Sequence, residues 1–424
     1  GTGLSTHELN QPGCYKDVKD TTIVSLFKTI KSEKQSHLFT DVETDLFLLA
    51  WTTTPWTLPS NTALAVGAGI KYLKVKTVNP YSGTLITVLI CKDRFNYYFK
   101  QDNAKLSFDD YKPGDKNIPY QILGEYLGKD LENLEYEQLI PWIKTKTPAF
   151  KVITGDFVTT EDGTGIVHIA PTFGADDDRV AKLAGIPPLI VEDKLGNICP
   201  LVDRQGKFYK IEDLNPNFVE NYVIKENYKE YAGKFVKNDY DPNANENDET
   251  TDVEIAVMLK SQEKAFKIEK YVHNYPHCWR TDKPVLYYPL DSWFIKTTAV
   301  KDRLIELNKT INWKPKSTGE GRFGKWLENL VDWNLSRSRY WGTPLPIWCT
   351  KDKKHKKCIG SAEELVKEIN ISIEKGYMQY HPWPEFIVGD YSKENYEKID
   401  LHRPDVDDII LVAENGEKMY REID

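Results

Sequence analysis

A series of short hydrophobic segments constrains the fold of this chain more than any other feature. Leu46–Trp51 is a continuous apolar run of strand length, and Ile70–Val78 alternates as a half-buried strand does. The turn residues Asn79–Gly83 separate it from Thr84–Cys91, which is a hairpin pattern. This region therefore predicts a sheet or barrel. Further strands are expected at residues 150–157 and 165–169.

Size and composition indicate a globular protein with more than one domain. The 424 residues suffice for two or three domains at roughly 150 residues each, and the net charge is −8. The longest uncharged stretch, Leu46–Ile70, is interrupted by prolines and polar residues, so we predict no membrane segment. Six cysteines without any Cys-x-x-Cys pair favour a reducing compartment, and we expect a cytoplasmic location.

The character of the sequence changes near residue 270, where we predict a domain boundary. The first forty residues contain one extended pattern, Thr21–Lys28, which is typical of a linker or ribbon. Residues 92–150 are polar and aromatic, and we expect an insertion of irregular structure there. The acidic stretch Asn238–Asp252 predicts an exposed loop, and a helix capped by Thr251 and Asp252 should follow it.

Hydroxyl and amide side chains gather directly after the first apolar run. Consecutive residues of an extended chain point to opposite faces, so a plain core would bury some hydroxyls of Thr52, Thr53 and Thr54 without partners. Two prolines stiffen the backbone ahead of Asn61. The pattern favours either hydrogen bonding to a polar ligand or a Thr-rich turn at a strand end, and the turn is the more common outcome.

A second polar segment combines glycines, a histidine and three aspartates. Glycines allow a backbone to approach a ligand closely, but Gly163-x-Gly165 alone is a weak signal. The run Asp176–Asp178 suits a metal, a cationic ligand or the cap of a helix expected at residues 179–184, of which the cap is most common. His168 lies on an apolar strand, where a buried structural histidine is more common than a functional one.

Four segments together carry a family resemblance. They are Trp51–Asn61, Gly163–Asp177, His277–Arg280 and Trp333–Gly342, in this order. Over nearly the whole chain they resemble isoleucyl-tRNA synthetase, a class I enzyme. The related leucyl and valyl enzymes carry a Thr-Thr-Arg-Pro-type motif in place of Thr53–Trp56 and lack the histidine after Gly-Thr-Gly-x-Val, which favours the isoleucyl family.

The resemblance implies a mixed α/β fold with three parts. Residues 1–40 would be a linker or ribbon segment, 41–268 a β-barrel-centred editing domain, and 269–424 a connective and partial α/β catalytic-domain segment. Thr21–Lys28 would pair with Val285–Lys296. The chain has no initiating Met and neither ATP-handling signature, His-x-Gly-His or Lys-Met-Ser-Lys-Ser. We therefore expect a fragment that cannot activate isoleucine, with ATP and Mg required only by the full-length enzyme.

The activity implied by the resemblance is editing of misacylated tRNA. A pocket discriminates one methylene by only about 1–3 kcal/mol, a limit for which this synthetase is itself the standard example. A second site that hydrolyses the smaller product removes the error. The implied substrate is valine esterified to the acceptor end of tRNA(Ile), with valyl-adenylate as a second candidate. The implied partners are this tRNA and the remainder of the synthetase, and editing needs no cofactor or metal.

Site residues follow from the resemblance position by position. Asp177 matches the aspartate that anchors the α-ammonium group, and His168 matches the residue that crowds the larger isoleucine side chain. The wall that holds the terminal adenosine, the ester and a water is matched by Thr52, Thr53, Thr54 and Asn61. The pocket is completed by Thr57, Gly163, Thr164 and Gly165. A positioned water is the expected nucleophile, because no Ser/His pair or metal site is evident.

Alternatives from other classes stay open. The chain would bind tRNA without hydrolysis if essential elements lie elsewhere, or it would be the editing domain of a valyl or leucyl synthetase. A metal-dependent hydrolase would use Asp176–Asp178 with His168. Residues 313–360 carry eleven basic and four acidic side chains, and they form a solvated surface, a tRNA surface or an interface with the rest of the enzyme. Two His/Cys groups, near residues 273–278 and 349–358, lack the four ligands of a structural zinc site.

Overall fold

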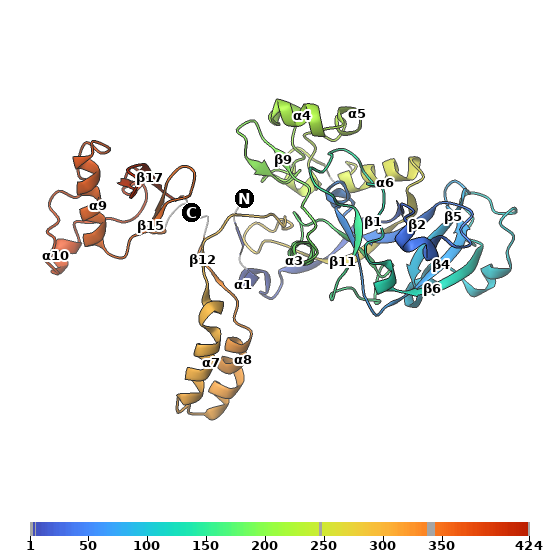
Figure 1. Ribbon diagram of the computed structural model, residues 1–424, viewed down its shortest axis with the longest axis horizontal. Helices are drawn as coiled ribbons and strands as arrows, with labels where there is room; N and C mark the ends of the chain where they lie inside the picture. Colours follow the sequence, from blue (N-terminus) through green and yellow to red (C-terminus); the bar gives the residue numbers. More distant parts are fainter. Residues whose placement is uncertain (1–2, 5, 246–247, 337–343, 423–424) are drawn as a thin grey trace. The chain divides into compact units, whose positions relative to one another are not determined.

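The computed structural model describes residues 3–4, 6–245, 248–336 and 344–422. The chain forms two compact units, Gly3–Pro289 and Leu290–Asp424, which are coloured along the sequence in Figure 1. The division lies beyond residue 270, where the composition changes. No helix in the described part of the chain is long and apolar enough to cross a membrane.

The first unit is built on one mixed sheet of nine strands. Their bounds are β1 (Tyr15–Lys28), β2 (Leu46–Thr52), β3 (Ala63–Val66), β4 (Lys71–Val78), β5 (Leu85–Cys91), β6 (Tyr120–Leu127), β7 (Lys151–Thr154), β8 (Ile166–Ile169) and β11 (Ala265–Pro276). The order is β6-β4-β5-β2-β8-β3-β7, and β1 pairs with both β2 and β11. The predicted strands and hairpin between residues 46 and 91 are confirmed. The sheet curls into a half-barrel (Figure 1). Among the described residues, no strand pairing joins β6 to β7, the two ends of this order.

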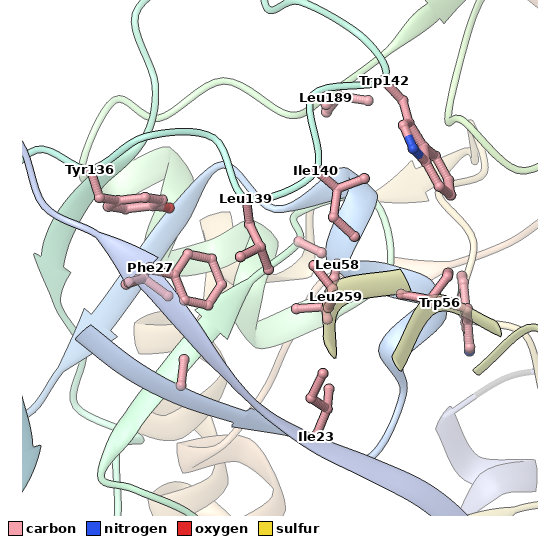
Figure 2. Close-up of a cluster of buried hydrophobic side chains, with 14 of the residues drawn as sticks. Ile23, Phe27, Trp56, Leu58, Tyr136, Leu139, Ile140, Trp142, Leu189 and Leu259 are labelled. Atoms are coloured by element: carbon pink, nitrogen blue, oxygen red, sulfur yellow. The ribbon is translucent and has the colours of Figure 1, made fainter. Parts of the chain in front are cut away.

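Both faces of this sheet are buried, which explains the continuous apolar runs. In β1, Ile23 and Phe27 pack into the larger core, whereas Val24 and Leu26 on the opposite face pack into a second core. Figure 2 shows Ile23 and Phe27 in the larger core. Other side chains of that core that the figure labels are Trp56, Leu58, Tyr136, Leu139, Ile140, Trp142, Leu189 and Leu259. The sheet is therefore the shared wall of two hydrophobic clusters.

The helices of the first unit are short. They are α1 (Thr6–Leu9), α2 (Phe95–Tyr98), α3 (Ala175–Leu183), α4 (Pro216–Tyr222), α5 (Lys225–Tyr228) and α6 (Thr251–Ser261), and a small ribbon joins β9 (Val191–Glu192) to β10 (Ile198–Cys199). The helix predicted after the acidic loop is confirmed as α6, but its cap is Thr250, whose Oγ1 accepts a hydrogen bond from Val253 N at 3.3 Å. Helix α3 begins before the predicted residue 179, so Asp176–Asp178 lie in its first turn.

The pairing expected for the N-terminal ribbon is wrong. β1 pairs antiparallel with β11, from Tyr15 opposite Pro276 to Ser25 opposite Ala265, and not with residues 285–296. Its C-terminal half also pairs with β2, so both edges of β1 are occupied inside the sheet. The region 92–150 is also more regular than expected, because β6 pairs with β4.

The second unit has a small core of its own. Its elements are β12 (Phe294–Ile295), α7 (Lys301–Thr310), α8 (Phe323–Glu328), β13 (Trp333–Asn334), β14 (Ile347–Cys349), β15 (Lys356–Cys358), α9 (Ala362–Glu374), α10 (Lys393–Tyr396), β16 (Ile410–Val412) and β17 (Lys418–Arg421). Strand β12 pairs with β13, and the other four strands form an antiparallel sheet in the order β15-β14-β17-β16. Buried Trp348 donates its Nε1 proton to Ile409 O at 2.9 Å. Residues 337–343 of the Trp333–Gly342 motif lie outside the described residues.

The turn before β8 accepts only glycine at position 165, which gives a stability test. Gly165 has a φ of +72°, and a Cβ there would lie 2.3 Å from Cys91 Cβ. Gly196 also has a positive φ, +83°, but nothing lies within 4 Å of its Cβ position. We expect Gly165→Ala to lower the free energy of unfolding by about 1–3 kcal/mol more than Gly196→Ala, because only the first adds a steric clash. Urea unfolding measures both variants, and equal losses would contradict the close contact.

Candidate functional site

The carboxyl ends of two parallel strands, β2 and β8, lie side by side and bring the two predicted motifs together. β2 and β8 pair in parallel with Trp51 opposite Val167, so the next residues, Thr52 at the end of β2 and His168 within β8, lie side by side. On its other edge β8 pairs antiparallel with β3, which places His168 opposite Leu64. Thr52 and His168 are both buried. The strand pairing therefore joins motifs that are more than a hundred residues apart in the sequence.

The Thr-rich segment is a chain of hydroxyl contacts. Thr54 N donates to Thr52 Oγ1 at 3.1 Å, and the hydroxyls of Thr52 and Thr54 lie 3.3 Å apart. Thr54 Oγ1 is 3.4 Å from Thr57 Oγ1, which donates to Thr54 O at 2.8 Å. The 3₁₀ turn η2 (Pro55–Ser60) holds Thr57 in this position. Thr53 is half-buried and has no hydrogen-bond partner among the described residues.

His168 is held by hydrogen bonds on both ring nitrogens. Its Nε2 lies 2.9 Å from Thr57 Oγ1. With the single Thr57 proton donated to Thr54 O at 2.8 Å, we assign the proton of the histidine contact to Nε2. Nδ1 is then an acceptor, and Asn61 Nδ2 lies 3.5 Å from it. Tyr136 Oη fixes that amide by donating to Asn61 Oδ1 at 2.7 Å. The arrangement selects one neutral tautomer of the ring.

Burial keeps this ring uncharged at neutral pH. Desolvation lowers the pKa of His168 from 6.5 to about 4. The donor nitrogen of Asn61 that faces Nδ1 works in the same direction, because a second ring proton would meet it. His168 is therefore a fixed polar wall at pH 7 and is not positioned to act as a general base.

Asp177 differs from the aspartates on either side of it. Asp176 pairs with Arg179 and Asp178 pairs with Lys182, and both contacts are exposed. Asp177 makes no salt bridge among the described residues, and its Oδ2 accepts a hydrogen bond from Ala170 N at 2.8 Å. Burial raises its pKa from 3.8 to about 6. Asp177 thus presents a partly buried carboxylate just beyond the end of β8.

The glycine turn is shaped by contacts within the chain. Gly163 has a φ of +65°, and its carbonyl accepts hydrogen bonds from Arg94 Nε at 3.1 Å and Tyr98 Oη at 3.2 Å. A Cβ at Gly163 would lie 2.8 Å from Trp51 Cε3. Thr164 is buried and donates its hydroxyl to Ile166 O at 3.2 Å. The close approaches that these glycines permit are therefore to the protein's own backbone and side chains.

Of the predicted site residues, the structure joins five directly by hydrogen bonds or hydroxyl contacts. They are Thr52, Thr54, Thr57, Asn61 and His168. Asp177 lies at the same end of β8 through Ala170, whereas the hydroxyl of Thr164 bonds within its own turn. No group of three His, Cys, Asp or Glu side chains in the described ranges is arranged to hold a metal ion. The described residues therefore provide no ligand set for the metal-dependent alternative.

Sequence reasoning missed three residues that position this site. Tyr136 fixes the Asn61 amide, and Asp252 Oδ1 accepts a hydrogen bond from Trp56 N at 2.9 Å. Gly174 leaves room for the carboxyl group of Asp177, since a Cβ at position 174 would lie 2.8 Å from Asp177 Cγ. Gly174 directly precedes the observed helix α3, and Asp252 had been predicted only as a helix cap, so neither role at the site had a local sequence signal.

Comparisons with known proteins agree with the predicted resemblance. A family model described as tRNA synthetases class I (I, L, M and V) matches residues 3–402. The chain is 62% identical over its full length to an isoleucine–tRNA ligase of Bacteroides fragilis and 60% identical to one of Porphyromonas gingivalis. It is 38% identical over 99% of its length to one of Clostridium tetani. The chain spans 37% of the length of the first two relatives and 31% of the third.

The comparison with solved structures gives a distant match to an editing-domain structure. A crystal structure described as GlLeuRS-CP1 matches 59% of this chain and 100% of its own, at 13% identity and a TM-score of 0.35. A likeness at that level supports no further argument. The assignment to a family therefore rests on the sequence matches, which confirm the resemblance to isoleucyl enzymes.

The tautomer of His168 can be tested without any substrate. We expect its Nε2 to be protonated and its ring to stay neutral down to about pH 5, because burial lowers its pKa to about 4. NMR of the chain labelled with ¹⁵N-histidine reports both ring nitrogens, and the signals missing from His168→Ala assign this residue among the eight histidines. A midpoint near the ordinary pKa of 6.5, or a protonated Nδ1, would contradict the described hydrogen bonds.

Proposed function

Because the chain belongs to the tRNA synthetases of class I (I, L, M and V), we propose that its first unit is an editing site that hydrolyses valine from tRNA(Ile). The relatives that match over the whole chain are isoleucine–tRNA ligases, which favours tRNA(Ile) over the tRNAs of the leucyl and valyl enzymes. Valyl-adenylate is a second substrate, since it presents the same valyl group. The chain would thus be the aminoacyl-tRNA ester hydrolase part of an isoleucine–tRNA ligase.

The unpaired carboxylate of Asp177 is the observation that carries the proposal. A pKa of about 6 leaves this group largely ionised at pH 7, and no basic side chain in the described part of the chain pairs with it. An α-ammonium group would supply the missing charge and form a charge-assisted hydrogen bond. Only an aminoacyl group carries such an ammonium next to an ester carbonyl. Asp177 would therefore both select and orient the substrate.

The neighbouring side chains suit the remainder of a valyl ester. His168, held by Thr57 and Asn61, is rigid enough to exclude a side chain one methylene longer. We assign the exposed parts of Thr53 and Thr54, with Thr52, to the terminal adenosine, the ester and a bound water. The turn Gly163–Gly165 would form the edge of the pocket. In this assignment Thr57 acts mainly by holding the histidine ring.

A positioned water is the proposed nucleophile. Its oxygen bonds to the ester carbonyl carbon, the bond to the ribose oxygen breaks, and that oxygen leaves with the proton that the water loses. His168 does not take this proton, because its Nε2 proton faces Thr57 and its Nδ1 faces a donor. The threonine hydroxyls would orient the water, and the rate gain would come from positioning and hydrogen bonding.

The whole enzyme and its partners belong to the same proposal. The acceptor end of tRNA(Ile) would deliver the ester, and the remainder of the synthetase would hold the tRNA in the cytoplasm. ATP with Mg would serve only the activation of isoleucine by the full-length enzyme. The competing function is tRNA binding without hydrolysis. The unpaired carboxylate of Asp177 favours a site for an aminoacyl group, which binding of tRNA through its phosphates would not require.

Release of the amino acid from tRNA tests the function. We expect the purified chain to release valine from Val-tRNA(Ile) faster than isoleucine from Ile-tRNA(Ile), by about tenfold or more, because the pocket rejects one methylene. The assay contains a chelator, so that sustained turnover excludes a metal-dependent hydrolase. Binding of tRNA without release of valine would support the binding function instead. Equal release of both amino acids would contradict editing.

Asp177→Ala tests the residue that carries the proposal. We expect hydrolysis of Val-tRNA(Ile) to fall by about 10- to 150-fold, since a hydrogen bond to a charged group contributes about 1.5–3 kcal/mol. Asp178→Ala is the matched control, because its exposed carboxylate in the same helical turn pairs with Lys182. The turnover number kcat and the Michaelis constant KM are measured for both variants in the same assay. An equal loss in the two variants would remove Asp177 from the site.

A further inference from the structure

The 3₁₀ turn that carries Thr57 is capped from a distant helix. Thr54 occupies the capping position of η2 but makes no side-chain capping hydrogen bond. Pro55 has no N–H, so Trp56 N is the first backbone donor of the turn, and it donates to Asp252 Oδ1 at 2.9 Å. Asp252 lies in the first turn of α6, 196 residues further along the chain. A carboxylate at this place supplies the cap that the local sequence does not.

Burial at the position of Asp252 destabilises an ionised carboxylate. Its side chain is buried, and desolvation raises its pKa to about 7, against the attraction of Lys237 and Lys270. An apolar residue of similar volume would avoid that desolvation. Lys237 also contacts Asp20 Oδ2 at 3.4 Å, and His273 Nε2 lies 3.1 Å from the same oxygen. Asp252 thus lies near a group of polar and charged side chains: Asp20 on β1, Lys270 and His273 on β11, and Lys237 from the segment before α6.

Two contacts lead from the capped backbone to the candidate site. Thr57, the next residue after Trp56, holds His168 Nε2 at 2.9 Å. The ring of Trp56 packs edge-on against Phe173, with the centroids 4.9 Å apart. Phe173 directly precedes Gly174, which makes room for Asp177. A shift of the Trp56 backbone would therefore move Thr57 and the His168 ring bonded to it. Through the packing of the Trp56 ring on Phe173, it would also move the segment before α3.

From these contacts we propose that Asp252 is a positioning residue that fixes η2 and thereby sets the orientation of His168 and the selectivity of the site. This inference rests on the proposed function only for its consequence on selectivity. Asp252 touches neither the substrate nor the reacting atoms. Its effect passes through the backbone of Trp56 and the hydroxyl of Thr57.

Asp252→Leu tests the inference because it removes the hydrogen-bond acceptor while keeping the number and branching of the side-chain heavy atoms. We expect the ratio of Ile-tRNA(Ile) to Val-tRNA(Ile) hydrolysis to rise about tenfold, because the His168 ring loses its fixed position. Asp252→Asn keeps an oxygen that can accept from Trp56 N, and its ratio should stay within about twofold of the wild type. A residue needed only for folding would lower both rates together and leave the ratio unchanged, which would overturn the inference.

Glu254→Ala is the matched control. Glu254 is the other acid in the first turn of α6, and it pairs with Lys234 and not with η2. We expect the rates of Val-tRNA(Ile) and Ile-tRNA(Ile) hydrolysis by Glu254→Ala, and the ratio of the two rates, to match those of the wild type. If Asp252→Leu does not fold, Asp252→Ala is measured in the same way. A change of ratio in Glu254→Ala equal to that in the Asp252 variants would assign the effect to the helix end in general and overturn the specific role.

NMR of the ring nitrogens separates this inference from the proposed function. In ¹⁵N-histidine-labelled protein, Asp252→Leu should shift the His168 nitrogen signals or mix the two tautomers, whereas Glu254→Ala should leave them unchanged. Unchanged His168 signals in Asp252→Leu would overturn the positioning role. If the wild-type chain hydrolyses neither ester, the proposed function fails. The NMR result then decides alone whether Asp252 positions the histidine.

Discussion

The site depends on the way in which β2 shares one of its edges between two parallel strands. β1 occupies one edge of β2, while the other edge is paired with β5 at Leu46–Leu48 and with β8 at Trp51. One edge cannot hold two strands at the same level, so β5 has to end where β8 begins. Cys91 N, at the end of β5, donates to Thr164 O at 3.0 Å in the turn that starts β8. Glycine on both sides of Thr164 makes this close junction possible.

Buried polar groups then fix the site, because each must find a partner. The single proton of Thr57 decides which nitrogen of His168 is the donor, and Tyr136 decides how Asn61 is oriented. Such a network has one arrangement that satisfies all its members, so it is rigid. Asp177 differs from these side chains, since its carboxylate accepts from backbone N–H groups and has no cation among the described residues. A cationic ligand group would supply that missing charge.

The sequence predicted well what depends on local pattern. The apolar run, the hairpin and the helix after the acidic loop all appear, because period and turn residues determine them. The pairing of Thr21–Lys28 was wrong, since an alternating strand pattern does not specify its partner, and β11 competes with residues 285–296. The contact between Trp56 and Asp252 spans 196 residues, and no local pattern encodes it. The hydroxyls of Thr52 and Thr57 bond within the turn, so the Thr-rich turn that the sequence favoured is present.

The charges of the two central side chains imply a division of roles. A site that must reject a longer side chain gains nothing from a charged imidazole, whose hydration would hold water where the apolar group should fit. Burial keeps His168 neutral, so it can act by shape. The common feature of all aminoacyl groups, the α-ammonium, calls for a charge, and Asp177 keeps a pKa low enough to be ionised at pH 7. In the proposed assignment, Asp177 would recognise the aminoacyl group and His168 would limit the size of its side chain, so two different residues near the end of β8 would carry the two tasks.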